Sequence, residues 1–320
     1  MLKYVSSFIF IFYFLLGCTA DFYVNKEGKS LVYNPLFNSK LDILLVVDNS
    51  GSMEKHQEYL ANSAPGLTSR LESLGFDFQI AVTSTDLSQQ GQRGRFVGDQ
   101  KILASGQPQL DQKLRKYILL GSQGSSQEEG LGAAKRALSS PLVEGENAGF
   151  LRSDAFLIIL ILSNENDYSS DKAQDYVDFF NELKPPLEGR ERGWMLNFIG
   201  VTGAKDENCT TFGDYKDVGY RYLDLVRYSG GQAHTICTTN LKNAVDNVQK
   251  VLLTLLTEII LERVPDVETI KVYFNNVEVP KDEHNGWSYR AEKNSVIFHG
   301  TFIPKTITKI NIFYTPVAAK

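Results

Sequence analysis

The chain has 320 residues, 42% of them hydrophobic, and carries a formal net charge of −5 at pH 7. This length fits one large domain, or one domain with a small second unit, and the apolar fraction supports a packed core. The acidic balance and the lack of any long basic run exclude nucleic acid from the expected partners.

The first residues predict export. Lys3 precedes an unbroken apolar run at positions 8–16, which is shorter than the ~20 residues that a transmembrane helix needs. A charged start, a short apolar core and a small-residue end are typical of a cleaved signal peptide. We therefore expect residues 1–17 to be a signal peptide that directs the chain out of the cytoplasm.

The end of this segment, Leu15-Leu16-Gly17-Cys18, resembles a bacterial lipobox. The resemblance implies cleavage before Cys18 and lipidation of its thiol and new amino terminus. An incidental cysteine after a plain signal peptide is the alternative. With Thr19 next, the family pattern implies sorting to an outer membrane. We expect a lipid-anchored protein of the bacterial cell envelope, on its periplasmic or outer face, with residues 18–39 as a polar tether.

Strand and helix patterns alternate over the following part of the chain. Apolar runs that suit strands lie at residues 43–47, 76–83, 156–162, 194–201 and 233–237. Helical patterns lie at residues 56–74, 110–120, 127–138, 171–183, 219–228 and 241–264. Runs without polar alternation suit parallel strands buried on both faces. This order predicts an α/β domain, residues 40–264, with a doubly wound, mostly parallel sheet flanked by helices.

Two segments complicate the pattern, and a third departs from it. Pro65 is expected to kink or split the first helix. The polar, glycine-rich residues 89–106 predict a loop with an edge hairpin formed by residues 95–97 and 101–104. After Pro265 no helical pattern intervenes. Short strands are predicted there at residues 269–274, 277–279, 287–290, 295–299 and 306–314, which together make a small β domain, residues 265–320.

Three cysteines are present. If Cys18 carries lipid, Cys209 and Cys237 are left as an even pair in an oxidising compartment, where a disulfide is expected. A redox pair is the alternative interpretation, but no C-x-x-C spacing supports it.

The most informative motif is Asp48-Asn49-Ser50-Gly51-Ser52, directly after the apolar run at residues 43–47. Open α/β sheets place their sites at the carboxyl ends of strands. A carboxylate and two hydroxyls offer small oxygen ligands to a hard divalent cation. The motif D-x-S-x-S resembles the metal-ion-dependent adhesion site (MIDAS) of von Willebrand factor type A (VWA) domains. An ordinary strand-to-helix turn, capped by Asp or Ser, is the alternative interpretation.

Such a site draws on two further loops. In the second loop, Ser125 best matches the family threonine, with Ser126 next, although both serines also suit the cap of a helix that begins near Gln127. In the third, Asn164 stands where the family has aspartate, so a weaker cation site is expected. The metal ligands implied are Asp48, Ser50, Ser52, Ser125 and Asn164. Residues expected to support them are Ser126, Asp86, Glu165 and Asp167.

The similarity narrows to bacterial surface lipoproteins with a VWA domain and covers residues 40–263, including Gly219-Tyr220-Arg221-Tyr222. It implies a divalent cation, Mg²⁺ first and Mn²⁺ or Ca²⁺ next, with an open coordination position for an acidic side chain of a protein partner. No enzymatic activity is implied, since neither a G-x-S-x-G motif nor zinc-ligand histidine spacing is present. A metal-independent scaffold in an envelope assembly and a hydrolase are the alternatives.

Overall fold

The computed structural model describes residues 31–33, 36–37, 39–187, 191–203, 209, 217–304 and 308–317. The predicted signal peptide, Cys18 and most of the predicted tether lie outside these residues. Within the described ranges, no helix combines the length and apolar character needed to cross a membrane.

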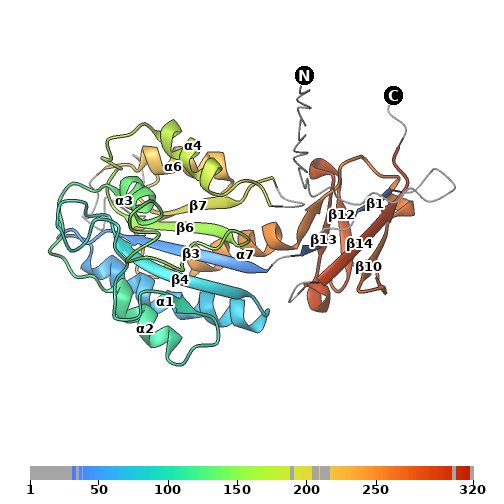
Figure 1. The fold of residues 1–320 in the computed structure, drawn as a ribbon, viewed down its shortest axis with the longest axis horizontal. Helices are drawn as coiled ribbons and strands as arrows, with labels where there is room; N and C mark the ends of the chain where they lie inside the picture. Colours follow the sequence, from blue (N-terminus) through green and yellow to red (C-terminus); the bar gives the residue numbers. More distant parts are fainter. Residues whose placement is uncertain are drawn as a thin grey trace, which may run out of the picture.

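A six-stranded sheet forms the centre of the larger part of the molecule (Figure 1). Its strands are β3 (Lys40–Val47), β4 (Asp77–Ser84), β5 (Leu103–Ala104), β6 (Phe156–Ser163), β7 (Trp194–Gly200) and β8 (Ala233–Thr235). The spatial order is β5-β4-β3-β6-β7-β8, and every pair is parallel except β4 with the edge strand β5. The predicted doubly wound, mostly parallel sheet is confirmed.

Helices cover both faces of this sheet (Figure 1). One face carries α1 (Glu54–Ser73), α2 (Leu110–Ile118) and α7 (Lys242–Thr257), and the other carries α3 (Gly130–Ala137), α4 (Ala173–Leu183) and α6 (Tyr220–Ser229). Along β3, Ile43 and Leu45 belong to one apolar core, whereas Leu44 and Val46 belong to the other. Burial on both faces explains why the strand sequences show no polar alternation.

The first helix is continuous, so the predicted split at Pro65 does not occur. A proline inside a helix leaves the carbonyl four residues earlier without its usual N–H donor. Here that carbonyl belongs to Ala61, and the Arg115 side chain of α2 donates to it at 3.5 Å. Packing of α2 against α1 therefore supplies the hydrogen bond that Pro65 removes.

Two other predicted elements are wrong. Residues 95–97 form no strand, and β5 alone lies at this edge of the sheet. Gly94 and Gly98 flank the segment with φ values of 80° and 94°, which interrupt an extended backbone. The predicted helix over residues 241–264 ends at Thr257 and continues as strand β9 (Glu258–Ile260), which pairs with Ser295–Ile297 through long-range contacts.

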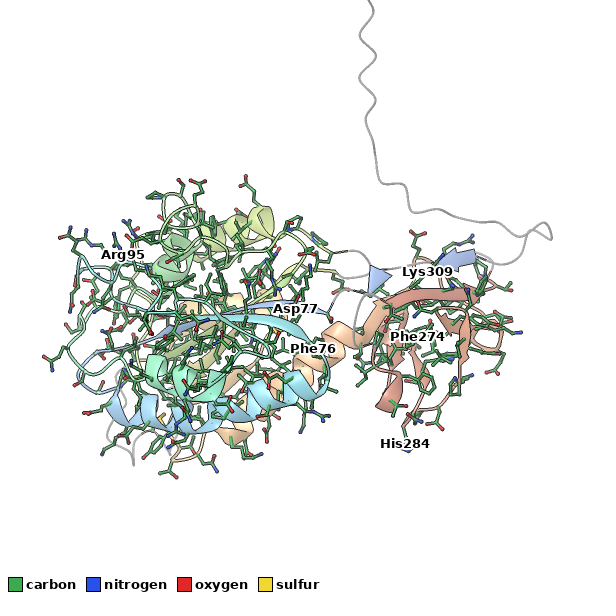
Figure 2. The ribbon with its side chains drawn as sticks, turned by 60° about the horizontal axis from the view of Figure 1, so that its bottom comes forward. Phe76, Asp77, Arg95, Phe274, His284 and Lys309 are labelled. Atoms are coloured by element: carbon green, nitrogen blue, oxygen red, sulfur yellow. A yellow bond between two sulfur atoms is a disulfide. The ribbon has the colours of Figure 1, made fainter. Side chains whose placement is uncertain are left out.

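The remaining strands form a small β unit with its own apolar core (Figure 1). It contains β9, β10 (Lys271–Phe274), β11 (Val277–Val279), β12 (Trp287–Arg290), β13 (Ser295–Phe298) and β14 (Thr308–Tyr314). Strands β1 (Leu31–Tyr33) and β2 (Leu36–Phe37), which lie in the predicted tether, pair with β14. In Figure 2, Asp77 at the start of β4 lies toward this unit and Arg95, which follows β4, lies on the opposite side. The carboxyl ends of the parallel strands therefore face away from the β unit.

Candidate metal site

The Asp48 carboxylate is held between the two central strands. Asp48 follows β3 directly, and its N–H donates to the Leu162 carbonyl of β6 at 2.9 Å. One carboxylate oxygen accepts the Ser50 N–H at 2.8 Å, and the other accepts the Ser163 hydroxyl at 2.8 Å. The side chain is 0% exposed. Burial raises the pKa of Asp48, which the hydrogen bonds from Ser50 and Ser163 partly oppose.

The position of Asp48 also follows from the strand order. Counted along the chain, the sheet has the order 3-2-1-4-5-6, which reverses between β3 and β6. Ligands of open α/β sheets bind outside the carboxyl ends of the strands where the order reverses. Asp48 and Asn164 immediately follow the two strands that meet at this point.

The two serines of the first loop differ in their contacts. The Ser50 side chain is 4% exposed, and its hydroxyl oxygen has no hydrogen-bond partner among the described residues. Ser52 is half-buried, and its hydroxyl accepts the Asn164 side-chain N–H₂ at 3.0 Å. Loss of hydrogen bonds to water on burial is costly for a hydroxyl unless another ligand replaces them. The Ser50 oxygen therefore fits the donor set of a bound cation.

The second loop is fixed to the first through the Gln57 side chain of α1 and by a direct backbone hydrogen bond. The Gln57 side chain donates to the carbonyls of Asp48 (2.8 Å) and Gly121 (2.9 Å) and accepts the Gly121 N–H at 3.0 Å. The Gly124 N–H donates to the Asn49 carbonyl at 2.8 Å. A Cβ at position 124 would lie 2.4 Å from the Asn49 side-chain oxygen, so this approach of the loops requires glycine.

Ser125 is held in a turn. Its N–H donates to the Asp86 carboxylate at 3.0 Å, and its hydroxyl accepts the Gln127 N–H at 3.0 Å. Burial raises the pKa of Asp86, but hydrogen bonds from Ser88, Ser125 and Gln89 outweigh it and leave the pKa lowered. Asp86 thus positions the second loop as a charged acceptor. The predicted helix begins at Gly130 rather than near Gln127, and Ser126 is exposed.

Glu128 is the site residue that the sequence reasoning missed. Its side chain is 1% exposed, one carboxyl oxygen accepts the Thr85 hydroxyl, and the other has no hydrogen-bond partner among the described residues. Burial and then the negative charge of Asp48 raise the pKa of Glu128 to about 9. An acidic residue before a helix has an ordinary explanation in the helix dipole, so the sequence carried no signal that this one is buried beside Asp48.

The acids of the third loop have other partners. Asp167 is 2% exposed, accepts the Leu131 N–H of α3 at 3.0 Å and forms an ion pair with Arg221 at 3.1 Å. It therefore joins the third loop to α3 and α6. Glu165 is half-buried, and its N–H donates to the Ser163 hydroxyl at 3.1 Å. Through Ser163, the Glu165 backbone is connected to the Asp48 carboxylate.

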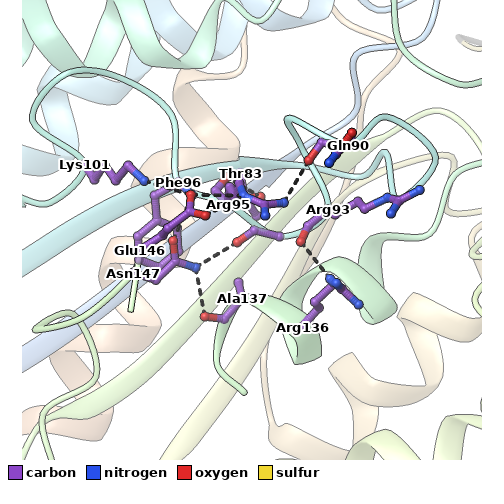
Figure 3. A network of polar contacts seen from close by, with 11 residues as sticks. Thr83, Gln90, Arg93, Arg95, Phe96, Lys101, Arg136, Ala137, Glu146 and Asn147 are labelled. Carbon is purple, nitrogen blue, oxygen red and sulfur yellow. Dashed lines mark hydrogen bonds and ion pairs between the residues drawn. The ribbon is translucent and has the colours of Figure 1, made fainter. Parts of the chain in front are cut away.

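The loop after β4 adjoins the first site loop through Gln92 and Asn49. A polar network holds this loop (Figure 3). Arg95 forms an ion pair with Glu146 at 2.9 Å, and Lys101 reaches the same carboxylate at 3.4 Å. The Asn147 side chain donates to the Gly94 and Ala137 carbonyls, at 2.8 and 3.0 Å. This anchored loop carries Gln92, whose side-chain oxygen accepts the Asn49 amide N–H₂ at 3.2 Å.

Cys209 and Cys237 form the predicted disulfide. Both residues are buried in the core that contains α1 and α7. The bond connects position 209, between β7 and α6, with the segment that follows β8.

Within the described residues, no three His, Cys, Asp or Glu side chains gather as a metal-binding group. The oxygen-bearing side chains that the described loops bring to this end of the sheet are carboxylates, hydroxyls and an amide. Such all-oxygen sets suit Mg²⁺, Mn²⁺ and Ca²⁺ better than soft transition metals.

By strand order and loop placement the larger unit has a VWA-like fold. No family model matches the sequence, and no curated protein sequence matches it. Proximal thread matrix protein 1 from the mussel byssus is 12% identical, with a TM-score of 0.42, over 72% of this chain and 51% of that chain. A further structure of that protein, with the same values, has a zinc-occupied MIDAS motif.

The pilus adhesin SpaC from Lactobacillus rhamnosus GG, in its open conformation, is 13% identical, with a TM-score of 0.42, over 92% of this chain and 42% of that chain. This chain thus spans about half the length of the mussel protein and less than half of the pilus adhesin. The function proposed below is based on the geometry of the site itself.

Proposed function

We propose that the protein binds a divalent cation at the carboxyl ends of β3 and β6 and uses it to bind a protein partner through an acidic side chain. The observation that carries this proposal is the pairing of two features in one loop. Asp48 is fully buried and forms no ion pair with any described basic residue, and the buried Ser50 hydroxyl beside it has no partner. Such groups are stabilised when a cation supplies the missing interaction.

Asp48, Ser50 and Ser52 would hold the cation, with Asn164 on the third loop. When bound, the cation supplies a positive charge that attracts a carboxylate from outside. The chain's own residues set the geometry: Ser163 and the Ser50 N–H orient the Asp48 carboxylate, and Asn164 orients the Ser52 hydroxyl. We expect Mg²⁺ first, with Mn²⁺ or Ca²⁺ as alternatives, because all three accept oxygen ligands.

Exposed aromatic side chains beside the site support a protein as the partner. Tyr168 is 45% exposed and Tyr220 is 57% exposed. The Tyr168 N–H donates to the Glu128 carbonyl at 2.7 Å, and the neighbouring Arg221 N–H donates to Asn166 of the third loop at 3.1 Å. Tyrosine is enriched in protein interfaces because it combines apolar area with a polar hydroxyl. We therefore propose a binding protein rather than an enzyme.

The proposed setting is the bacterial cell envelope. It is supported by the signal-like segment and the lipobox-like sequence at Cys18. A lipid anchor at Cys18 would hold the chain at a membrane surface, where each buried methylene contributes about 0.8 kcal/mol. The site loops face away from the β unit (Figure 2), whose strands β1 and β2 lie in the last part of the proposed tether.

Thermal unfolding with titrated Mg²⁺, Mn²⁺ and Ca²⁺ tests the cation. We expect the cations to raise Tm in the wild type and in Glu54→Gln but not in Asp48→Ala. Glu54 is a suitable control because it is exposed and starts α1, directly after the site loop. Equal cation shifts in all three proteins would contradict a site at Asp48.

Affinity capture from native envelope extracts tests the partner. We expect a protein that is retained in Mg²⁺ and released both by EDTA and by Asp48→Ala. A partner that stays bound in EDTA would instead support the metal-independent scaffold. A hydrolytic product formed by the wild type but not by Asp48→Ala would support an enzyme.

A further inference from the structure

We propose that Glu128, and not Ser125, supplies the cation ligand from the second loop, so that the site contains two carboxylates from two different loops. This inference rests on the proposed cation site and specifies its ligands. It assigns a direct role to a residue that the D-x-S-x-S resemblance did not single out, and it removes one of the ligands that this resemblance implied.

The first support is where the Glu128 side chain lies. It is 1% exposed although it belongs to a polar loop of which the flanking residues Ser126 and Gln127 are exposed. Thr85, at the end of β4, donates its hydroxyl to one carboxyl oxygen. The Thr85 N–H in turn donates to the Val47 carbonyl of β3 at 3.2 Å, which fixes Thr85 next to the strand that ends at Asp48. The side chain is therefore directed inward and is held there.

The second support is that no described basic side chain pairs with either buried acid. The other carboxyl oxygen of Glu128 meets no hydrogen-bond donor, the Glu128 side chain contacts the Asp48 carboxylate, and neither acid forms an ion pair with a described basic residue. The Asp48 charge acts on Glu128 repulsively, and so does that of Glu165. Two like charges in a buried site are unfavourable unless a proton or a cation lies between them. A divalent cation balances both.

The contacts of Ser125 indicate a structural role and not a ligand role. Its hydroxyl accepts the Gln127 N–H at 3.0 Å, and its own N–H donates to Asp86 at 3.0 Å. A short-range bond of this kind closes a turn and is a common role of serine. Ser125 is also only half-buried, whereas Ser50 and Glu128 are both buried with an unpartnered oxygen. Ser125 therefore shapes the loop that delivers Glu128.

This assignment also explains how the site has two carboxylate ligands although its third loop supplies the neutral Asn164. The third loop contributes the neutral Asn164, whose amide donates to Ser52. With Glu128 as a ligand, the charge that Asn164 lacks comes from the second loop. The site then pairs two carboxylates with a divalent cation and stays neutral before an acidic partner arrives. A site with Asp48 as its single carboxylate would be weaker, because cation affinity follows ligand charge.

Isothermal titration with Mn²⁺ near neutral pH tests the assignment in the wild type, Glu128→Gln, Ser125→Ala and Glu129→Gln. Glu129 is the matched control, because it is the same residue type and adjoins Glu128 but is half-buried. We expect Glu128→Gln to weaken Mn²⁺ binding about tenfold or more, since even residues that only orient metal ligands have effects of this size. Glu129→Gln should bind as the wild type does, and Ser125→Ala, which removes only the hydroxyl that closes the turn, should lose less affinity than Glu128→Gln.

The outcomes separate this inference from the proposed function. Wild-type affinity in Glu128→Gln, with binding lost in Ser125→Ala, would overturn the ligand assignment and leave the cation site standing. No Mn²⁺ binding by the wild type would overturn both. Urea unfolding in EDTA shows whether Glu128→Gln is folded. If it is not, Glu128→Asp, which keeps the charge and withdraws it by one methylene, replaces it and should also weaken binding.

Discussion

A buried aspartate lies at each end of strand β3, and the two aspartates differ in their partners. Asp42 and Asp48 are both 0% exposed. Asp42 accepts the Arg152 guanidinium at 2.8 Å and the Arg152 backbone N–H at 2.7 Å. Asp48 receives hydrogen bonds from Ser50 and Ser163 but forms no ion pair with a described residue, and it lies beside the acidic Glu128.

The comparison distinguishes a structural acid from a ligand. A carboxylate that only connects segments is best buried with a permanent counter-ion, as Asp42 is with Arg152, because an unpaired buried charge is strongly unfavourable. At the carboxyl end of β3, no described basic side chain pairs with Asp48, and a second acid, Glu128, lies beside it. This arrangement suits an ion that comes from solution.

Breaking the Asp42 pair should have the largest effect. Arg152→Met removes the ion-pair partner of the buried Asp42 and leaves only the charge of Lys184 to act on it. We expect the free energy of unfolding to fall by about 3 kcal/mol, the lower end for such pairs, because the Arg152 side chain is 18% exposed and Lys184 remains. Urea denaturation measures this. Lys40→Met is the control: it removes the exposed pair with Asp154, which should contribute less than about 1 kcal/mol. Similar losses in both variants would refute the structural role of Asp42.

A substitution that removes the Asp48 charge should not lower the free energy of unfolding. In EDTA, Asp48→Asn removes an uncompensated buried charge, so we expect its free energy of unfolding to equal or exceed that of the wild type. With Mn²⁺ at 100 times its Kd, the wild type should gain about 2.7 kcal/mol and the variant nothing. Denaturation curves with and without Mn²⁺ measure both quantities. A destabilised variant in EDTA would make Asp48 a structural acid like Asp42.

A dependence of stability on pH is also expected. The pKa of Glu128 is raised to about 9, from an ordinary value of 4.5. In the cation-free protein, the stabilisation that comes from keeping this carboxyl protonated is complete below the unfolded pKa and is lost as pH rises through about 9. Urea unfolding in EDTA should therefore show stability falling with rising pH in the wild type, with a flatter profile in Glu128→Gln.

With saturating Mn²⁺ the dependence should reverse at acidic pH, because protons compete with the cation for the carboxylates. Parallel pH profiles of the wild type and Glu128→Gln in EDTA would show that Glu128 does not hold a proton in the folded protein.

The sequence predicts those elements that depend on local pattern. The strands that directly precede Asp48 and Asn164 were recognisable because burial on both faces leaves continuous apolar runs. Strand β9 was not, because Glu258 and the residues after it also suit a helix end. Its strand conformation depends on pairing with β13 and on contacts of Glu258 with Arg290 and Ser295.

The residues of the candidate site also fall into those that a local motif predicts and those that depend on distant contacts. Asp48, Ser50 and Ser52 were predictable from a five-residue motif after a strand. Glu128 is held by Thr85, which follows β4, and lies beside Asp48, which follows β3; neither residue is near it in the sequence. The partners of Asp167 are likewise distant, because Arg221 belongs to α6. Side-chain direction in a loop is decided by such contacts and not by local pattern.

Anomalous diffraction from crystals of the wild type grown with Mn²⁺ tests the cation site most directly. We predict a single strong manganese peak at the carboxyl ends of β3 and β6, in contact with Asp48, Ser50 and Glu128. A peak elsewhere, or no peak at a Mn²⁺ concentration that saturates other oxygen-ligand sites, would contradict it.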